Sequence, residues 1–535
     1  MIPKHTTLPV SLFLLTTMLL AGCSGSDDSE TPGGAEIDSS NQPAVGEIQW
    51  FEGSIDEAFA TAKRQDKPIF LYWGADWCPP CNQIQATIFN RQKFVVKSSL
   101  FVPVYLDGDT ANAQRVGEEF GVMGYPTMIL FSPQGEEVTR IPGGIDIQRY
   151  INVLDLAMSK IEPVARIVHR LSIRGAPLRR KEFRLLAYYS WEQDNERVLT
   201  RFNKLELFEI LSSTCPPTLV EACSRIDSEY LTTIADAMTD VEKPFVPNDD
   251  LKNVALKKLR AVLQNKKLVR ANLEFVLHSS ADMARAFTDS QSPRRASLLG
   301  LWGQALKVVA ADPQISVMER LYTSRGRIRM ARIDDPDKPL SPEFQKRIAD
   351  HVDWADQRAI TSYERQAVIN AAWNILSEAG MDEKATELLT LEIEKSHSPF
   401  YFMLDLAELA ARAGKTDEAV DWLRRAYDES SGSATRFQWG YNYLVGLLEL
   451  VPTKTSLIEN EAIRVFDELD GQGNAFYQRT KDRLGRLDGR FREWNADGKY
   501  NKSIRLIRTK MQSICSSIPE TDESRMTCDS FLAEA

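Results

Sequence analysis

The chain has 535 residues, of which 43% are hydrophobic and 26% are charged, and its net charge is −10 at pH 7. This length and ordinary globular composition predict about two to four domains with full hydrophobic cores. The acidic balance argues against a nucleic-acid partner, because binding to phosphates needs a basic surface.

The N-terminus has the features of a secretory signal. A short polar start is followed by an apolar run over residues 8–20, which is too short to cross a bilayer stably, so we predict a signal peptide over residues 1–22. Leu20-Ala21-Gly22-Cys23 resembles the bacterial lipoprotein box. The resemblance implies cleavage before Cys23 and acylation of that residue. An ordinary signal peptide with an incidental cysteine is the alternative.

Several expectations follow for localisation. In lipoproteins of this kind, an aspartate directly after the acylated cysteine favours retention in the inner membrane. This chain has Ser24 at that position, so the same resemblance implies the outer membrane. We expect the protein to lie on the periplasmic side and to be held to the membrane by its lipid anchor only. Residues 23–46 are rich in Ser, Gly, Asp and Pro and nearly lack large apolar side chains. They predict a flexible tether.

The first folded segment contains a closely spaced cysteine pair, Cys78-Pro79-Pro80-Cys81. The apolar, aromatic run over residues 69–73, which follows Lys67 and Pro68, predicts a buried strand, and residues 82–89 have apolar positions at helical spacing. The pair therefore lies where a strand leads into a helix, with Cys78 at the helix start.

This position suggests redox chemistry for the pair. A thiolate at Cys78 meets the positive end of the helix dipole, which makes Cys78 the predicted nucleophile, and Cys81 can close the disulfide one turn later. Neither Pro79 nor Pro80 has an N–H, so the thiolate is expected to be less strongly stabilised than one followed by non-proline residues. A zinc site is disfavoured, because no second Cys-x-x-Cys exists and the histidines are scattered. We expect no metal and no cofactor.

The cysteine pair belongs to a series of three motifs. The stretches KPIFLYWGADWCPPC, FVPVYLDGD and GVMGYPTMILFSPQGEEV follow one another in the chain. Residues 47–160 resemble the thioredoxin family, particularly the thioredoxin-like domains of bacterial envelope proteins. The resemblance implies a central mixed sheet flanked by helices, catalytic Cys78 and Cys81, a cis Pro126, and substrate contacts from Trp77, Tyr125 and Pro126.

One position departs from the family pattern. Thioredoxins carry a buried acid in the strand, six residues before the first cysteine, and here that position is Tyr72. The family acid assists proton transfer for the second cysteine, so its absence puts rapid reductase activity in doubt.

The rest of the chain predicts an all-α region, divided into residues 161–345 and 346–535. Within residues 346–535 a pair of segments repeats with a spacing of 34 residues, which aligns Gly380 with Gly414 and Ala385 with Ala419. This pattern resembles tetratricopeptide repeats and suggests a surface for protein contacts; a generic array of helical hairpins is the alternative.

Four more cysteines form two close pairs, Cys215 with Cys223 and Cys515 with Cys528. Short spacings in an oxidising compartment predict structural disulfides, each contributing about 2–3 kcal/mol. Buried free thiols are the alternative.

Two functions remain open from the sequence. The first is a membrane-tethered thiol–disulfide oxidoreductase of the cell envelope, whose partners are protein thiols and disulfides and a thiol redox partner protein. The second is a non-catalytic envelope scaffold that binds partner proteins through its helical region.

Overall fold

The computed structural model describes residues 46–194, 197–199, 203–472 and 475–533. The predicted signal peptide, the lipidation site Cys23 and all but the last residue of the predicted tether lie outside these residues. Among the helices in the described ranges, none combines the length and apolar character needed to cross a membrane.

A four-stranded mixed sheet forms the N-terminal region. It consists of β1 (Ile69–Gly74), β2 (Val102–Asp107), β3 (Thr127–Phe131) and β4 (Glu137–Ile141), in the order β2-β1-β3-β4. The β1–β2 pair is parallel and the other two pairs are antiparallel. Every residue of β1 is buried, which explains its continuous apolar sequence.

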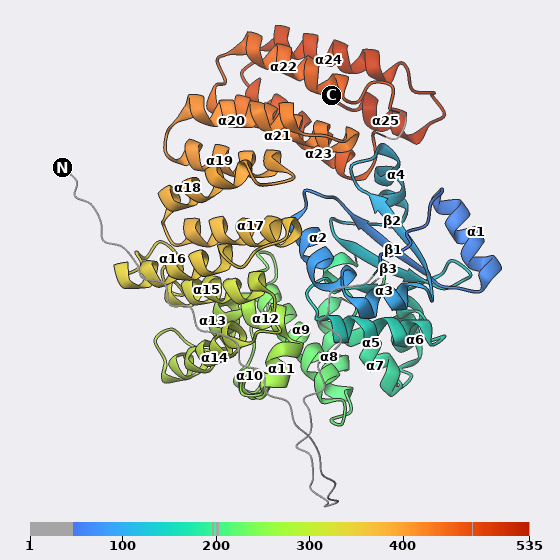
Figure 1. Cartoon of the computed structure of the whole chain (residues 1–535), viewed down its shortest axis with the longest axis vertical. Helices are drawn as coiled ribbons and strands as arrows, with labels where there is room; N and C mark the ends of the chain where they lie inside the picture. The colour runs from blue at the N-terminus through green and yellow to red at the C-terminus, as the bar shows by residue number, and fades with distance from the viewer. Residues whose placement is uncertain (1–45, 195–196, 200–202, 473–474, 534–535) are drawn as a thin grey trace, which may run out of the picture. The chain divides into compact units, whose positions relative to one another are not determined.

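Helices cover both faces of this sheet. Alternate residues of a strand point to opposite faces, so Ile69 and Leu71 pack with α1, while Phe70 and Tyr72 belong to the core beneath α2 and α5. In Figure 1 the strands accordingly lie between α1 and α2. The helices are α1 (Ile55–Gln65), α2 (Pro79–Ile84), the π-helix η2 (Gln85–Phe89), α3 (Gln92–Ser98), α4 (Ala111–Glu119) and α5 (Ile147–Met158).

The remainder of the described chain is helical, as the sequence predicts. Its first half contains α6 (Val164–Arg174), α7 (Arg180–Ala187), the 3-10 helix η3 (Trp191–Gln193), α8 (Lys204–Thr214), α9 (Val220–Met238), α10 (Asp249–Leu263), α11 (Lys266–Ala271), α12 (Leu273–His278), α13 (Ser280–Phe287), α14 (Pro293–Ala311) and α15 (Val317–Ala331). Its second half contains α16 (Pro342–Asp356), α17 (Ser362–Glu378), α18 (Asp382–Ile393), α19 (Pro399–Arg412), α20 (Thr416–Glu429), α21 (Ser433–Leu450), α22 (Thr455–Asp467), α23 (Gln478–Trp494), α24 (Asn501–Cys515) and α25 (Glu523–Asp529).

Successive helices from α16 to α20 pack side by side (Figure 1). The two glycines that the 34-residue spacing aligns, Gly380 and Gly414, both end a helix and both have φ of +73°. Glycine adopts this left-handed conformation without a steric penalty, which explains its use at both turns. The two helix pairs are thus alike in build, and their assignment to tetratricopeptide repeats stays a prediction.

The helical region and the sheet share one hydrophobic core. A single cluster of buried side chains includes Phe70 of β1, Trp439 of α21 and Phe491 of α23. α17 packs against α2, and α21 and α23 pack against α4. The helical region therefore contacts the segment that carries the Cys78–Cys81 pair.

Candidate active site

Cys78 and Cys81 form a disulfide at the start of α2. Cys78 is the N-cap residue with an extended backbone, and Pro79 and Pro80 begin the helix. The N–H of Cys81 donates to Cys78 Sγ at 3.3 Å. Since both prolines lack an N–H, Cys81 supplies the amide that donates to the sulfur.

Both cysteines are nearly inaccessible to solvent. Cys78 is 3% exposed and Cys81 is 1% exposed. Asn82, one residue further along α2, donates from Nδ2 to the carbonyl oxygens of Asp76 (2.6 Å) and Cys78 (2.9 Å). These bonds fix the loop between β1 and α2 and therefore the position of the first cysteine.

The loop before β3 contributes a second side of the site. The Tyr125–Pro126 peptide bond is cis, as the thioredoxin resemblance implies. The Tyr125 hydroxyl donates to the Gly108 carbonyl at 2.8 Å, and burial raises the pKa of this phenol to about 12. The Pro126 carbonyl accepts a hydrogen bond from Gln193 Nε2 at 2.7 Å. Tyr125 and Pro126 thus hold fixed positions near the disulfide.

Trp77 lies between the thioredoxin-like segment and the helical region. Its ring stacks on Tyr401 of α19, with centroids 6.0 Å apart, and meets Trp439 of α21 edge to face at 4.9 Å. Its carbonyl oxygen accepts a hydrogen bond from Gln366 Nε2 of α17 at 3.2 Å. Three helices of the C-terminal region therefore contact the residue that precedes Cys78.

Asp109, just after β2, extends the same contact. Trp77 Nε1 donates to Asp109 Oδ1 at 2.8 Å, and the hydroxyl of Thr435 on α21 donates to the same oxygen. The N–H of Ala434 donates to the Asp109 carbonyl at 3.1 Å. Burial raises the pKa of Asp109 to about 7, although the hydrogen bond from Trp77 acts in the opposite direction. A titratable carboxyl thus joins Trp77 to α21.

Tyr72 occupies the position of the family's buried acid. It is 2% exposed and packs face to face with Tyr105 and edge to face with Phe89. Burial raises the pKa of Tyr72 well above its ordinary value. The phenol therefore stays protonated at neutral pH and cannot accept a proton from Cys81.

A pocket of about 370 Å³ reaches the first cysteine. One wall comes from the two loops of the thioredoxin-like segment, and the other comes from α19, α21 and α23. The lining residues are Trp77, Cys78, Pro79, Pro80, Met123, Gly124, Tyr125, Tyr401, Gln438, Gln478, Arg479, Asp482, Arg483 and Arg486. Cys78 is therefore part of the wall of this pocket.

The structure therefore gathers Trp77, Cys78 and Tyr125 around one pocket, while Pro126 lines a neighbouring cavity of about 230 Å³ with Pro80. Cys215–Cys223 joins α8 to α9, and Cys515–Cys528 joins α24 to α25. Both of these disulfides belong to the helical region.

Sequence reasoning missed the residues that contact Trp77 and line the pocket beside Cys78. Asp109 had a usable signal: β1 and β2 are parallel, with Gly74 opposite Asp107, so the loops that follow them lie at one edge of the sheet. Tyr401, Trp439 and Arg479 had no such signal, because they lie more than 300 residues from the cysteines in the sequence.

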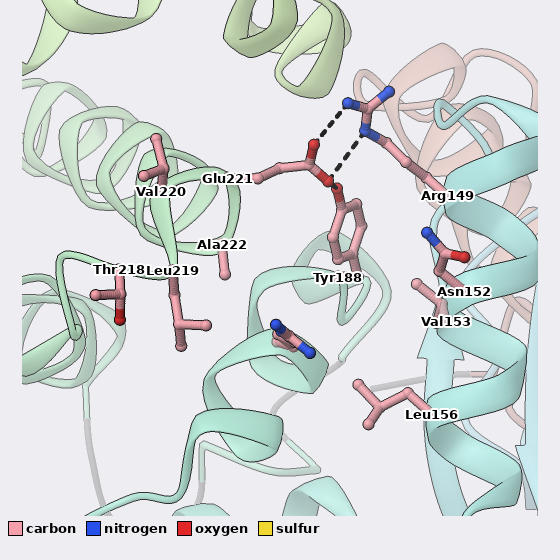
Figure 2. A pocket seen from close by; sticks show the side chains of 11 residues that line it. Arg149, Asn152, Val153, Leu156, Tyr188, Thr218, Leu219, Val220, Glu221 and Ala222 are labelled. Carbon is pink, nitrogen blue, oxygen red and sulfur yellow. Dashed lines mark hydrogen bonds and ion pairs between the residues drawn. The ribbon is translucent and has the colours of Figure 1, made fainter.

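A different cavity of about 460 Å³ lies between α5 and the helices α7 and α9 (Figure 2). Arg149 donates from Nη2 to Glu221 Oε2 at 2.6 Å and also binds Asp146, and the Tyr188 hydroxyl donates to Glu221 Oε1 at 2.5 Å. These charged groups therefore pair with one another at one side of the cavity. Within the described ranges, no three His, Cys, Asp or Glu side chains are grouped so that they could hold a metal ion.

Comparisons with known proteins agree with this geometry. Residues 55–157 match a family model described as a thioredoxin-like domain. Over 97 residues the chain is 29% identical to the thiol:disulfide interchange protein DsbD of Yersinia pestis (strain Pestoides F), a match that covers 17% of this chain and 16% of that protein. Thioredoxin H4 of Arabidopsis thaliana is 40% identical over 84 residues, which is 15% of this chain and 65% of that protein.

Among solved structures, a chain described as DsbH oxidoreductase aligns with 26% of this chain and 96% of its own length, with 20% identity and a TM-score of 0.20. The match to DsbD of Yersinia pestis covers only about a sixth of the length of that protein. The family model and the mixed sheet with helices on both faces together identify residues 55–157 as a thioredoxin-like domain.

Proposed function

We propose that the protein is a thiol–disulfide oxidoreductase of the bacterial cell envelope that exchanges disulfides with protein substrates through Cys78 and Cys81. The observation that carries the proposal is the Cys78–Cys81 disulfide at the start of α2 of a thioredoxin-like domain, with Cys78 lining a pocket between this domain and the helical region. The relative DsbD is a thiol:disulfide interchange protein by name, which supports the same reaction.

The exchange proceeds in two balanced steps. The Cys78 thiolate of the reduced protein attacks one sulfur of a substrate disulfide, so that a mixed disulfide forms and the other substrate sulfur leaves as a thiolate. The Cys81 thiolate then attacks Cys78 Sγ, which closes the Cys78–Cys81 bond and releases the second substrate thiolate. The reverse sequence oxidises a substrate dithiol with the same bond changes.

The neighbouring groups support distinct parts of this reaction. The Cys81 N–H, already 3.3 Å from Cys78 Sγ, stabilises negative charge on that sulfur. Trp77 and Tyr125 form the pocket walls beside Cys78 and are the proposed substrate contacts, together with Pro126. Because Tyr72 stays protonated, it does not supply the base that the buried family acid would provide for Cys81.

The envelope location is supported by the N-terminal sequence. Residues 1–22 have the features of a signal peptide, and we propose that acylated Cys23 anchors the chain to the outer membrane on its periplasmic side. The disulfides Cys215–Cys223 and Cys515–Cys528 suit an oxidising compartment. A Cys23→Ala variant is expected to lose incorporation of labelled palmitate and to leave the membrane fraction; continued labelling contradicts the anchor.

A scaffold without redox turnover is the competing function. The observation that favours it is the low exposure of the pair, 3% for Cys78 and 1% for Cys81. A trapping experiment decides between the two. In cells that express Cys81→Ser, mixed disulfides between Cys78 and envelope proteins are expected to accumulate, and reductant should release them. The Cys78→Ser/Cys81→Ser double variant is the matched control, and an identical pattern for both variants supports the scaffold.

A further inference from the structure

A row of arginines on α23 borders the disulfide pocket. Arg479, Arg483 and Arg486 follow one another at spacings of four and three residues, which places them on one face of the helix, and all three line the pocket that contains Cys78. The whole chain carries a net charge of −10, so this local excess of positive charge departs from the average surface. Asp482 is the acidic side chain in the lining.

Arg479 is fixed deep in the pocket wall. Its guanidinium lies 4.6 Å from the centroid of the Tyr125 ring and 5.4 Å from that of Trp77, and its Nη2 donates to the Gly108 carbonyl at 3.4 Å. These aromatic contacts hold the cation against the two loops that flank the disulfide. Arg479 thereby places a positive charge at the wall next to the reacting sulfur.

Arg483 and Arg486 are less constrained. The Arg483 guanidinium lies over the ring of Tyr441, 5.1 Å from its centroid, and Arg486 is exposed. Across the stretches of chain that the structure describes, neither side chain forms an ion pair with a carboxylate. Two guanidinium groups at the pocket rim therefore have their hydrogen-bonding edges available for an incoming anion.

We propose that this arginine face selects reactants whose reacting sulfur is flanked by carboxylates, so that Cys78 exchanges preferentially with acidic thiols and disulfides. The inference rests on the proposed function, because it assigns the specificity of the same pocket. A carboxylate beside the substrate sulfur is placed within reach of Arg483 or Arg486 as that sulfur approaches Cys78, which speeds encounter and favours the correct orientation.

The selected step is a single exchange. The thiolate of an acidic peptide attacks Cys78 Sγ of the oxidised protein, a bond forms between these two sulfurs, and the Cys78–Cys81 bond breaks with Cys81 leaving as a thiolate. One S–S bond replaces another and no external oxidant or reductant is needed. Formation of the mixed disulfide can be followed by mass.

The test compares peptide thiols of matched length. The oxidised full chain is mixed at low ionic strength with pentapeptides whose central cysteine is flanked by aspartates, asparagines or lysines, and with glutathione. Flanking charge also alters the intrinsic reactivity of each peptide, so each rate is divided by the rate of the Arg483→Gln/Arg486→Gln variant with the same peptide. The Arg260→Gln/Arg294→Gln variant, altered at two exposed arginines on α10 and α14, changes the net charge equally and is the control.

The proposal predicts that the double substitution in the pocket slows the aspartate peptide about tenfold more than the lysine peptide, and that added salt reduces this difference. The control variant should react with all peptides as the wild type does. If the double substitution slows the reaction of glutathione as much as that of the aspartate peptide, the reactant is a small anionic thiol. If it slows the aspartate peptide clearly more than glutathione, the reactant is an acidic protein segment.

Equal losses for the aspartate and lysine peptides overturn the inference and leave the proposed function intact, provided that the asparagine peptide reacts with the wild type. If no peptide and no glutathione forms a mixed disulfide with the wild type, the proposed function fails and the inference fails with it.

Discussion

The two walls of the pocket around Cys78 differ in origin and in chemistry. The wall from the thioredoxin-like domain contains the disulfide, two prolines and the aromatic rings of Trp77 and Tyr125. The wall from the helical region, about 300 to 400 residues further along the chain, contributes Tyr401 and three arginines. The first wall contains the sulfur that reacts in the proposed exchange, and the second wall contains the charged side chains of the lining.

This difference separates the reaction from its selectivity. The proposed exchange requires the two sulfurs of Cys78 and Cys81 and the loop that fixes Cys78, and all of these lie within residues 55–157. In the specificity that we propose, the choice of reactant depends on arginines that lie outside residues 55–157. Substitutions in the first wall should therefore abolish exchange, whereas substitutions in the second should change access, stability or preference.

The largest expected effect follows from removal of the resolving cysteine. Cys81→Ser should lower turnover of a peptide disulfide, with glutathione as the electron source, by on the order of 100-fold or more, because the mixed disulfide can no longer be closed. Turnover is measured as the rate of peptide thiol release. Cys515→Ser/Cys528→Ser removes a different disulfide and should keep wild-type turnover. Activity retained in Cys81→Ser means that another route resolves the intermediate.

The next effect concerns the aromatic contact between the two walls. Trp439 is 1% exposed and meets Trp77 edge to face. The substitution Trp439→Ala should lower the free energy of unfolding by about 3–5 kcal/mol. The same change should speed alkylation of reduced Cys78 several-fold, because α21 no longer covers Trp77. Urea unfolding followed by circular dichroism, and alkylation followed by mass, measure the two quantities.

The matched control for this variant is Trp302→Ala. Trp302 is also fully buried but lies on α14, where it donates to the Val276 carbonyl at 2.7 Å. The Trp302→Ala variant should show a similar decrease in the free energy of unfolding, and its Cys78 should be alkylated at the wild-type rate. If both variants speed alkylation equally, the contact between the walls does not control access.

A smaller effect should depend on pH through Asp109. Its folded pKa of about 7 lies above the ordinary value of 3.8, so protonation stabilises the folded state. This contribution is fully present below about pH 4, falls as the pH rises toward 7, and is absent above that. Between pH 5 and pH 8 the wild type should lose about 3 kcal/mol relative to Asp109→Asn.

Urea unfolding of both proteins across this pH range measures the difference. Asp289→Asn, which alters a carboxyl with 87% exposure, is the control and should follow the wild type. Parallel pH curves for the wild type and Asp109→Asn contradict the assignment of a raised pKa to Asp109.

The smallest effect is expected from a disulfide of the helical region. Cys515–Cys528 closes a short loop between α24 and α25, and its removal should cost about 2–3 kcal/mol. The midpoint of urea unfolding should fall, while the preference between aspartate and lysine peptides stays as in the wild type. A changed preference would show that α24 and α25 help to position the arginines on α23.

Local sequence patterns predicted much of the thioredoxin-like domain. The apolar run before Cys78 forms β1, and Cys78 caps α2, because each feature depends on near neighbours in the chain. The helical character of the following region was predicted for the same reason. The π-helical turn at η2 (Gln85–Phe89) was not distinguished from an ordinary helix.

The covering of the disulfide could not be predicted from the sequence. It depends on how α19, α21 and α23 pack against the loops after β1 and β2, and no local pattern determines that arrangement. Tyr401 and Trp439 have the pattern of ordinary core residues. Arg479 has that of a solvated charge on an amphipathic helix, although it lies against Trp77 and Tyr125.

The most direct test of the central claim is equilibration of the full chain with glutathione, with the redox state of each cysteine pair read by alkylation and mass. The account predicts that Cys78–Cys81 reaches an equilibrium potential between about −270 and −120 mV. Cys215–Cys223 and Cys515–Cys528 should stay oxidised under the same conditions. A Cys78–Cys81 disulfide that does not exchange with glutathione contradicts the account and favours a scaffold.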